Sequence, residues 1–194
     1  VLVAAELALD GARRPADSLI SAPSYAAALE PALRRWGWEP TQLQSALEEV
    51  RADAVQHQLQ TWLARHRFYP GVVQRLGQLD AEGADWGVLT TKGAAFAATI
   101  LSAAGLRPAF LAGHEQGSKP EVLGRLRDQQ RPLWFIEDRL PTLQLVRNTP
   151  GLESVHCLLA AWGYLAPGDR EALQDTGIAL LTADRFASPL AQWP

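Results

Sequence analysis

From Pro70 onward the sequence alternates between helix-like segments and short apolar runs, and this alternation constrains the fold more than any other feature. Three segments show helical patterns, with Pro near the start or Gly at the end, which suits the two helix termini. They span Pro70–Gly83, Ala94–Ala104 and Pro120–Gln130. Apolar runs bounded by turn residues predict buried strands at Asp85–Leu89, Ala109–Ala112, Leu133–Ile136, Val155–Ala160 and Ile178–Leu181. Such alternation predicts an α/β fold with a Rossmann-like, doubly wound parallel sheet.

The first third of the chain has helical patterns and no strand-like alternation. Apolar residues recur at three- and four-residue spacings over Pro40–His66, which predicts one long helix. Tyr25–Trp36 is predicted to be helical as well, and Asp10–Pro23 to be a loop because it contains a Gly and two Pro. We therefore expect a helical module over residues 1–66 and the α/β core over residues 67–194.

Charge and composition narrow the classes of partner. The formal net charge is -3 and the pI is about 5.8, which argues against a nucleic-acid or anionic-membrane surface because both need clustered positive charge. The apolar runs are shorter than a bilayer-spanning helix. Cys157, the single cysteine, cannot form an internal disulfide, so we expect a cytoplasmic protein in which this thiol is buried and structural. The sequence indicates no particular oligomeric state.

Ligands of a doubly wound sheet bind at the carboxyl ends of its strands. The first predicted strand runs into Thr90, Thr91, Lys92 and Gly93, just before a helix. A hydroxyl group with backbone N–H groups at a helix start can hold a phosphate. Simple N-capping of the helix by Thr90 or Thr91 would give the same pattern.

Lys119 precedes another predicted helix, in the run Gly117-Ser118-Lys119-Pro120. A lysine there could reach a phosphate or pair with a carboxylate, and the alternative is a solvated surface lysine. Only two of the 18 basic residues are lysine, and both Lys92 and Lys119 lie at strand-to-helix junctions. This placement favours a functional role.

The third strand end carries paired carboxylates, Glu137 and Asp138, after the apolar run Trp134-Phe135-Ile136. Carboxylate oxygens are the ligands that Mg²⁺ prefers. The alternative is an acidic helix N-terminus stabilised by the helix dipole.

Taken in order, a hydroxyl, a Lys-Pro pair and an acidic pair on successive strand ends make the chain resemble the haloacid dehalogenase-like (HAD) superfamily of phosphohydrolases, near its phosphoglycolate phosphatase-like branch. The resemblance covers about residues 68–182, beginning at Phe68-Tyr69-Pro70-Gly71-Val72 and including Ala161-Trp162-Gly163-Tyr164. It implies that residues 1–66 form a small helical cap.

The resemblance also implies roles for the residues of the strand ends. Thr90 would be the phosphate-binding hydroxyl, with Thr91 and Lys92 beside it. Lys119 would steady the charges of the nucleophile and the phosphate, and Asp138 would bind Mg²⁺ with Glu137 beside it. The implied substrate is a small phosphorylated metabolite.

The chain departs from this family in its first motif, a strand ending in Asp-x-Asp whose first Asp attacks phosphorus. The nearest imitation, Leu7–Gly11, would place Ala8 at the nucleophile position and Asp10 at the acid/base position. We favour instead a helix over Val1–Leu9, from its Ala, Leu and Glu content. The core would then lack its first strand, the nucleophile would lie upstream of Val1, and this chain alone would be inactive. Thr142, where many relatives carry a carboxylate, is a second departure.

These observations predict a Mg²⁺-dependent phosphatase acting on a small phosphate monoester through an aspartyl-phosphate. Two alternatives remain open: a non-catalytic phosphate-binding or scaffold protein with a degenerate first motif, and a phosphotransferase or phosphomutase of the same superfamily. His114 and Glu115 follow a predicted strand and could contact substrate, although we favour an exposed loop there. His57 and His66 are too far apart along their helix for paired zinc ligands.

Overall fold

The computed structural model describes residues 33–35, 37–127 and 131–194, and it divides the chain into two compact units. The first unit covers residues 1–58 and the second covers residues 59–194. The division lies inside the segment predicted as one long helix, before the 66/67 boundary expected from the sequence. The helix and loop predicted over Val1–Leu9 and Asp10–Pro23, and most of Tyr25–Trp36, fall outside the described residues.

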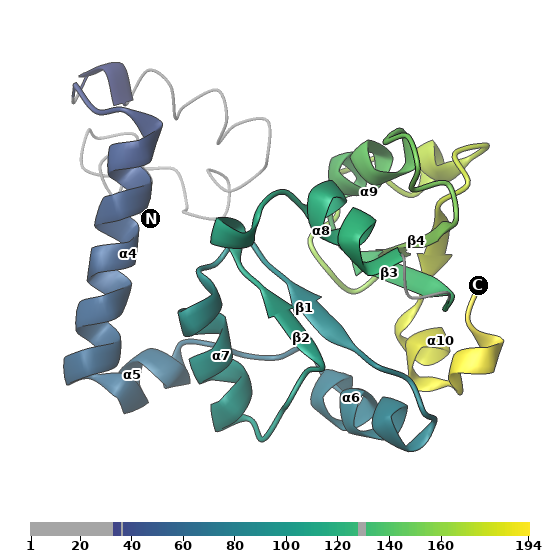
Figure 1. The fold of residues 1–194 in the computed structure, drawn as a ribbon, viewed down its shortest axis with the longest axis horizontal. Helices are drawn as coiled ribbons and strands as arrows, with labels where there is room; N and C mark the ends of the chain where they lie inside the picture. Colours follow the sequence, from purple (N-terminus) through teal and green to yellow (C-terminus); the bar gives the residue numbers. More distant parts are fainter. Residues whose placement is uncertain (1–32, 36, 128–130) are drawn as a thin grey trace. The chain divides into compact units, whose positions relative to one another are not determined.

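The segment Pro40–His66 was predicted to form one helix, and this prediction is wrong because the segment forms two helices (Figure 1). Helix α4 covers Pro40–His57 and α5 covers Leu59–Ala64. Pro40 suits the first turn of α4, and the Gln42 side chain accepts a hydrogen bond from the Glu39 backbone N–H at 2.7 Å. The break at Gln58 occurs without Pro or Gly, so neither of the usual sequence signals marks it.

The second unit is mixed α/β, and each predicted strand is present, β4 with the predicted ends and the others with small changes. Two sheets are formed, both with parallel neighbours. One sheet pairs β1 with β2, and the other has the order β3-β4-β5. The strands are β1 Gly87–Leu89, β2 Phe110–Ala112, β3 Leu133–Glu137, β4 Val155–Ala160 and β5 Ala179–Leu181.

Helices connect these strands in the expected order. The predicted helices correspond to α6, α7 and α8, and α9 and α10 are additional. The elements are α6 Val72–Ala81, α7 Ala94–Ala103, η1 His114–Gln116, α8 Lys119–Leu126, α9 Leu140–Arg147, η3 Glu171–Leu173, α10 Ala183–Ala187 and η4 Leu190–Gln192. Among the described residues, no helix is both long and apolar enough to cross a membrane.

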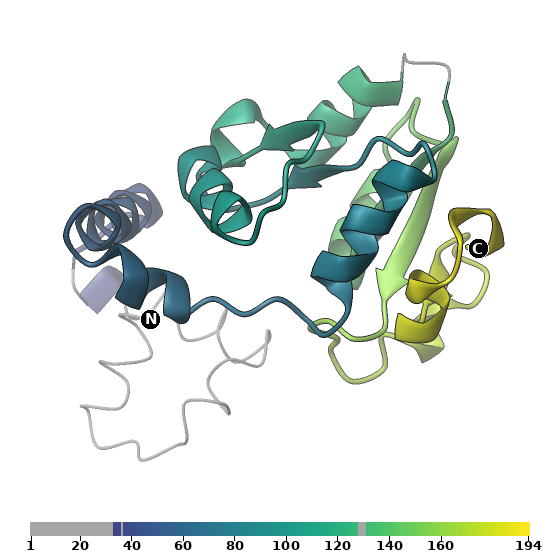
Figure 2. The same cartoon turned by 90° about the horizontal axis from the view of Figure 1, so that it is seen from below.

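Alternate residues of the strands pack on opposite faces, as strand geometry requires. Phe135 of β3 packs with the buried side chains of α8 and α9, whereas its neighbours Trp134 and Ile136 pack with Phe186 of α10. In the other sheet, Val88 packs against a cluster that α6 and α7 supply. Figure 1 shows β3 and β4 between α8 and α9 on one side and α10 on the other, with α7 beside β2, and Figure 2 shows the same elements from below. This packing places the loops that follow β1, β2 and β3 in one compact unit.

Candidate functional site

Lys119 and Glu137 form an ion pair that links the start of α8 to the end of β3. Ser118 caps α8, and the Glu121 carboxylate accepts hydrogen bonds from the Ser118 N–H at 2.7 Å and hydroxyl at 2.8 Å. Because this capping box begins the helix at Lys119, the lysine side chain starts from a defined backbone position. Its Nζ contacts Oε2 of Glu137 and lies 5.7 Å from the centre of the Phe135 ring. Lys119 is therefore not a solvated surface lysine.

The Glu137 carboxylate has protein partners at both oxygens. Oε2 contacts Lys119, and Oε1 accepts hydrogen bonds at 3.1 Å from the backbone N–H groups of Asp138 and Arg139. Its side chain is only 8% exposed, so the Lys119 cation offsets a nearly buried negative charge. Glu137 is thus held as the partner of Lys119.

Asp138 is the carboxylate that retains an oxygen for a further partner. Its Oδ2 accepts a hydrogen bond at 2.9 Å from the backbone N–H of Tyr164, which follows β4. In the part of the chain that the structure describes, Oδ1 accepts no hydrogen bond. The chemistry fits a Mg²⁺ ligand, since that ion takes one or two carboxylates and keeps several waters.

The described residues do not complete a metal site by themselves. Residues 33–35, 37–127 and 131–194 contain no group of three or more His, Cys, Asp or Glu side chains that could hold a metal ion. Glu137 and Asp138 are adjacent, and Thr142 supplies no carboxylate. Asp138 would therefore need further oxygen ligands from substrate, water or another segment.

The Thr90 hydroxyl organises the loop that follows β1. Thr90 continues the ladder by donating its N–H to the carbonyl of Ala112 at 2.9 Å. Its Oγ1 accepts a hydrogen bond from the Lys92 N–H at 3.1 Å, which forms a turn. Neither Thr90 nor Thr91 caps α7, whose N-cap is Gly93. The capping alternative considered from the sequence is therefore wrong.

The acceptor at the start of α7 comes from another loop. Oε1 of Glu115, in η1 after β2, accepts a hydrogen bond from the Ala94 N–H at 2.7 Å. Sequence reasoning identified Glu115 only as a residue near a strand end, because a contact across this separation leaves no local pattern. His114 lies beside it, with Nδ1 at 3.1 Å from Oε2 of Glu115, and both residues are exposed.

The predicted site residues thus form two groups. Lys119, Glu137 and Asp138 are joined by direct contacts. Thr90 and Lys92 are joined through the turn after β1, which also contains Thr91. In the described ranges, no hydrogen bond or ion pair joins Thr90 to Lys119. The loop containing Glu115 contacts the turn and leads directly into α8.

Comparison with known proteins assigns neither a family nor a function to the chain. No protein-family model matches the chain, and no curated protein matches it significantly.

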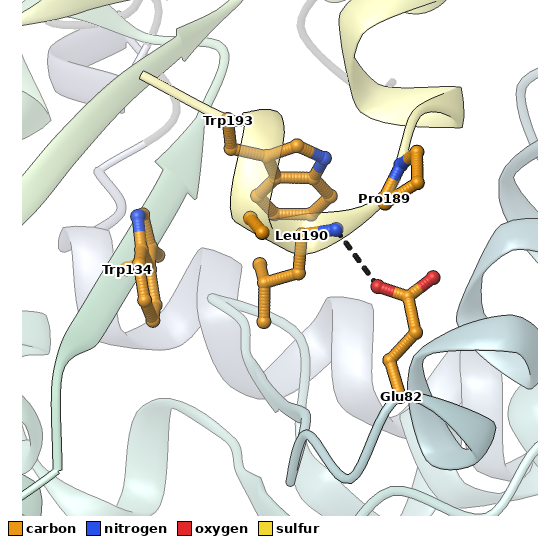
Figure 3. Close-up of a pocket in the computed structure, with 6 residues that line it drawn as sticks. Glu82, Trp134, Pro189, Leu190 and Trp193 are labelled. Atoms are coloured by element: carbon orange, nitrogen blue, oxygen red, sulfur yellow. Dashed lines mark hydrogen bonds between the residues drawn. The ribbon is translucent and has the colours of Figure 1, made fainter.

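A pocket of about 500 Å³ lies away from these strand ends, between α6, β3 and the C-terminal segment (Figure 3). Trp134, Leu190 and Trp193 supply its apolar surface. The one charged residue in its lining, Glu82, accepts a hydrogen bond from the Leu190 N–H at 2.7 Å. Trp193 packs against both the cluster that contains Val88 and the cluster that contains Trp134. The pocket thus lies where the side chains that pack against one sheet contact those that pack against the other.

Proposed function

We propose that the protein is a HAD-type, Mg²⁺-dependent phosphatase that acts on a small phosphate monoester. The observation that carries the proposal is the ion pair between Lys119 and Glu137, directly beside Asp138. It brings together a cation and a carboxylate with an available oxygen, from two different strand ends. Phosphoryl transfer needs positive charge close to the oxygens that become more negative in the transition state. The cation would supply this charge directly, and the carboxylate would supply it by holding Mg²⁺.

Each side chain then has a defined task. Lys119 offsets charge on the nucleophile and on the phosphoryl oxygens. The Thr90 hydroxyl, in its turn with Lys92, binds a phosphoryl oxygen beside Thr91. Asp138 would hold Mg²⁺, which supplies further charge neutralisation at the transferring group. Glu137 keeps Lys119 oriented.

The covalent step requires a carboxylate nucleophile, which we assign to an Asp in a segment preceding Val1. Its oxygen attacks phosphorus as the bond from phosphorus to the ester oxygen breaks, and the second Asp of the same Asp-x-Asp motif donates the proton with which the alcohol leaves. Water then hydrolyses the aspartyl-phosphate and releases inorganic phosphate.

The arrangement of the strands supports an additional strand. Among the described residues, β1 pairs only with β2, and β3 pairs only with β4. Both therefore have an open edge, and open edges are a liability in a folded protein. We propose that this additional strand carries the nucleophile and completes one doubly wound sheet.

The test is to express the natural protein with any segment encoded before Val1 and to measure Mg²⁺-dependent hydrolysis of p-nitrophenyl phosphate and small phosphate monoesters. Lys119→Ala should lose most of the activity, and Asp138→Asn should raise the Mg²⁺ concentration required. Arg185→Ala, which removes an exposed cation from α10, is the matched control and should remain active.

Normal turnover by Lys119→Ala would overturn the proposal. Binding of inorganic phosphate without turnover by the wild-type protein would favour the non-catalytic alternative. The 194-residue chain alone should show no turnover, and robust Mg²⁺-dependent hydrolysis by it would contradict the assignment of the nucleophile to another segment.

A further inference from the structure

Helix α7 begins without a capping side chain of its own. Its N-cap residue is Gly93, and no side chain at that position can accept a hydrogen bond from the first turn. The Ala94 N–H is instead bound by Oε1 of Glu115 at 2.7 Å. A residue from the loop after β2 therefore performs the capping that a local Ser, Thr or Asp usually performs.

The two loops also approach each other too closely for any side chain between them. A Cβ added to Gly113 would fall 2.3 Å from the Ala94 nitrogen and 2.8 Å from the Lys92 carbonyl oxygen. It would also fall 2.4 Å from Oε2 of Glu115. The close backbone contact and the hydrogen bond are separate observations, and both attach the turn after β1 to the loop after β2.

The Glu115 carboxylate is held in its charged form. Hydrogen bonds from its own backbone N–H and from the Ala94 N–H lower its pKa, with a smaller contribution from His114. A charged acceptor makes a stronger hydrogen bond than a neutral one, and negative charge is favoured at a helix N-terminus.

We propose that Glu115 is a positioning residue that fixes the turn formed by residues 90–93 by capping α7 from the neighbouring loop. Because its carboxylate already occupies the start of α7, a bound phosphate engages the turn at Thr90 rather than the helix end. This role for the turn rests on the proposed phosphatase function, whereas the capping itself does not.

Hydrogen exchange on the 194-residue chain tests the capping independently of activity. In Glu115→Ala, the amide of Ala94 should exchange about tenfold faster, because its acceptor is lost. In Glu115→Gln the change should be smaller, since the side-chain amide oxygen can still accept the bond. Glu153→Ala is the matched control, because Glu153 makes the same kind of bond to the Gly151 N–H at 2.9 Å in another loop. Unchanged exchange at Ala94 in Glu115→Ala would overturn the proposal.

Kinetics on the natural protein test the consequence for the site. With p-nitrophenyl phosphate, Glu115→Ala should lower kcat/KM about tenfold, chiefly through a higher KM, and Glu115→Gln should retain most of the activity. Faster exchange at Ala94 with unchanged kinetics in an active protein would overturn the positioning role. Faster exchange in a wild-type protein that hydrolyses no phosphate monoester would support the capping by Glu115 and defeat the phosphatase proposal.

Discussion

Gly163 lies so close to Asp138 that no other residue fits at its position. A Cβ built on Gly163 would fall 2.1 Å from the Asp138 Cβ and 2.8 Å from Oδ2. The same Oδ2 accepts the hydrogen bond from the Tyr164 N–H. The turn after β4 therefore determines where the Asp138 carboxylate lies.

Gly163→Ala should displace Asp138 and break its bond to Tyr164. Overpacking of this kind costs roughly 1–3 kcal/mol, so we expect a lower free energy of unfolding in urea titrations. In the natural protein, the same variant should require more Mg²⁺ for activity. A variant with wild-type stability would show that the loop relaxes freely and that Asp138 is not held by this contact.

Gly77→Ala is the matched glycine substitution and should act in the opposite direction. Gly77 lies on the exposed side of α6, and a Cβ there meets no atom within 4 Å. Replacing a helical Gly with Ala gains about 0.5–1 kcal/mol, because Gly loses more backbone freedom on folding. Urea titration should show this increase, and a decrease would mean that α6 is not helical there in solution.

Arg75 should contribute strongly to the stability of the second unit. It is 2% exposed, donates from Nε to the Phe186 carbonyl at 2.8 Å, and binds both carboxylate oxygens of Glu82. Its guanidinium also lies 5.5 Å from the centre of the Trp193 ring. Arg75→Met should lower the free energy of unfolding by roughly 2–4 kcal/mol, whereas Arg185→Met in α10 should change it little.

The contribution of Glu82 to the free energy of unfolding should depend on pH. Its hydrogen bonds with Arg75 and then with the Leu190 N–H hold its pKa below the ordinary value of 4.5. A carboxyl group whose pKa is lower in the folded state stabilises the protein above its unfolded pKa, and this contribution is lost as the pH falls through the folded pKa. Wild type should thus be more stable than Glu82→Gln at pH 7, with a difference that shrinks below pH 4.5. A difference that grows on acidification would contradict this linkage.

The strands could be predicted from sequence because each is a short apolar run bounded by turn residues. Val155–Ala160 has the predicted ends, and β1 is shorter than Asp85–Leu89 at its start. Helix α9 was not predicted, although Leu140, Leu143 and Val146 recur at three-residue spacing and are all buried. That spacing was the signal available for it.

The contacts that build the candidate site could not be predicted in the same way. Lys119, Thr90 and Asp138 could be identified because they follow strands, where ligands of parallel sheets bind. Their partners depend on tertiary packing: Glu115 reaches Ala94, and the Tyr164 N–H reaches Asp138 from another loop. Neither contact leaves a periodic or local pattern in the sequence.

The Lys119–Glu137 pair should show strong coupling in a double-mutant cycle on the 194-residue chain. Lys119→Met leaves the nearly buried Glu137 carboxylate without its cation, and Glu137→Gln leaves Lys119 without its counter-charge but keeps an oxygen for the Asp138 N–H. The stability lost in the double variant should therefore be smaller than the sum of the losses in the two single variants. We expect a coupling energy of about 1–2 kcal/mol from urea titrations at pH 7. Additive losses would mean that the two charges are solvated separately, and the geometry on which the phosphatase proposal depends would not persist in solution.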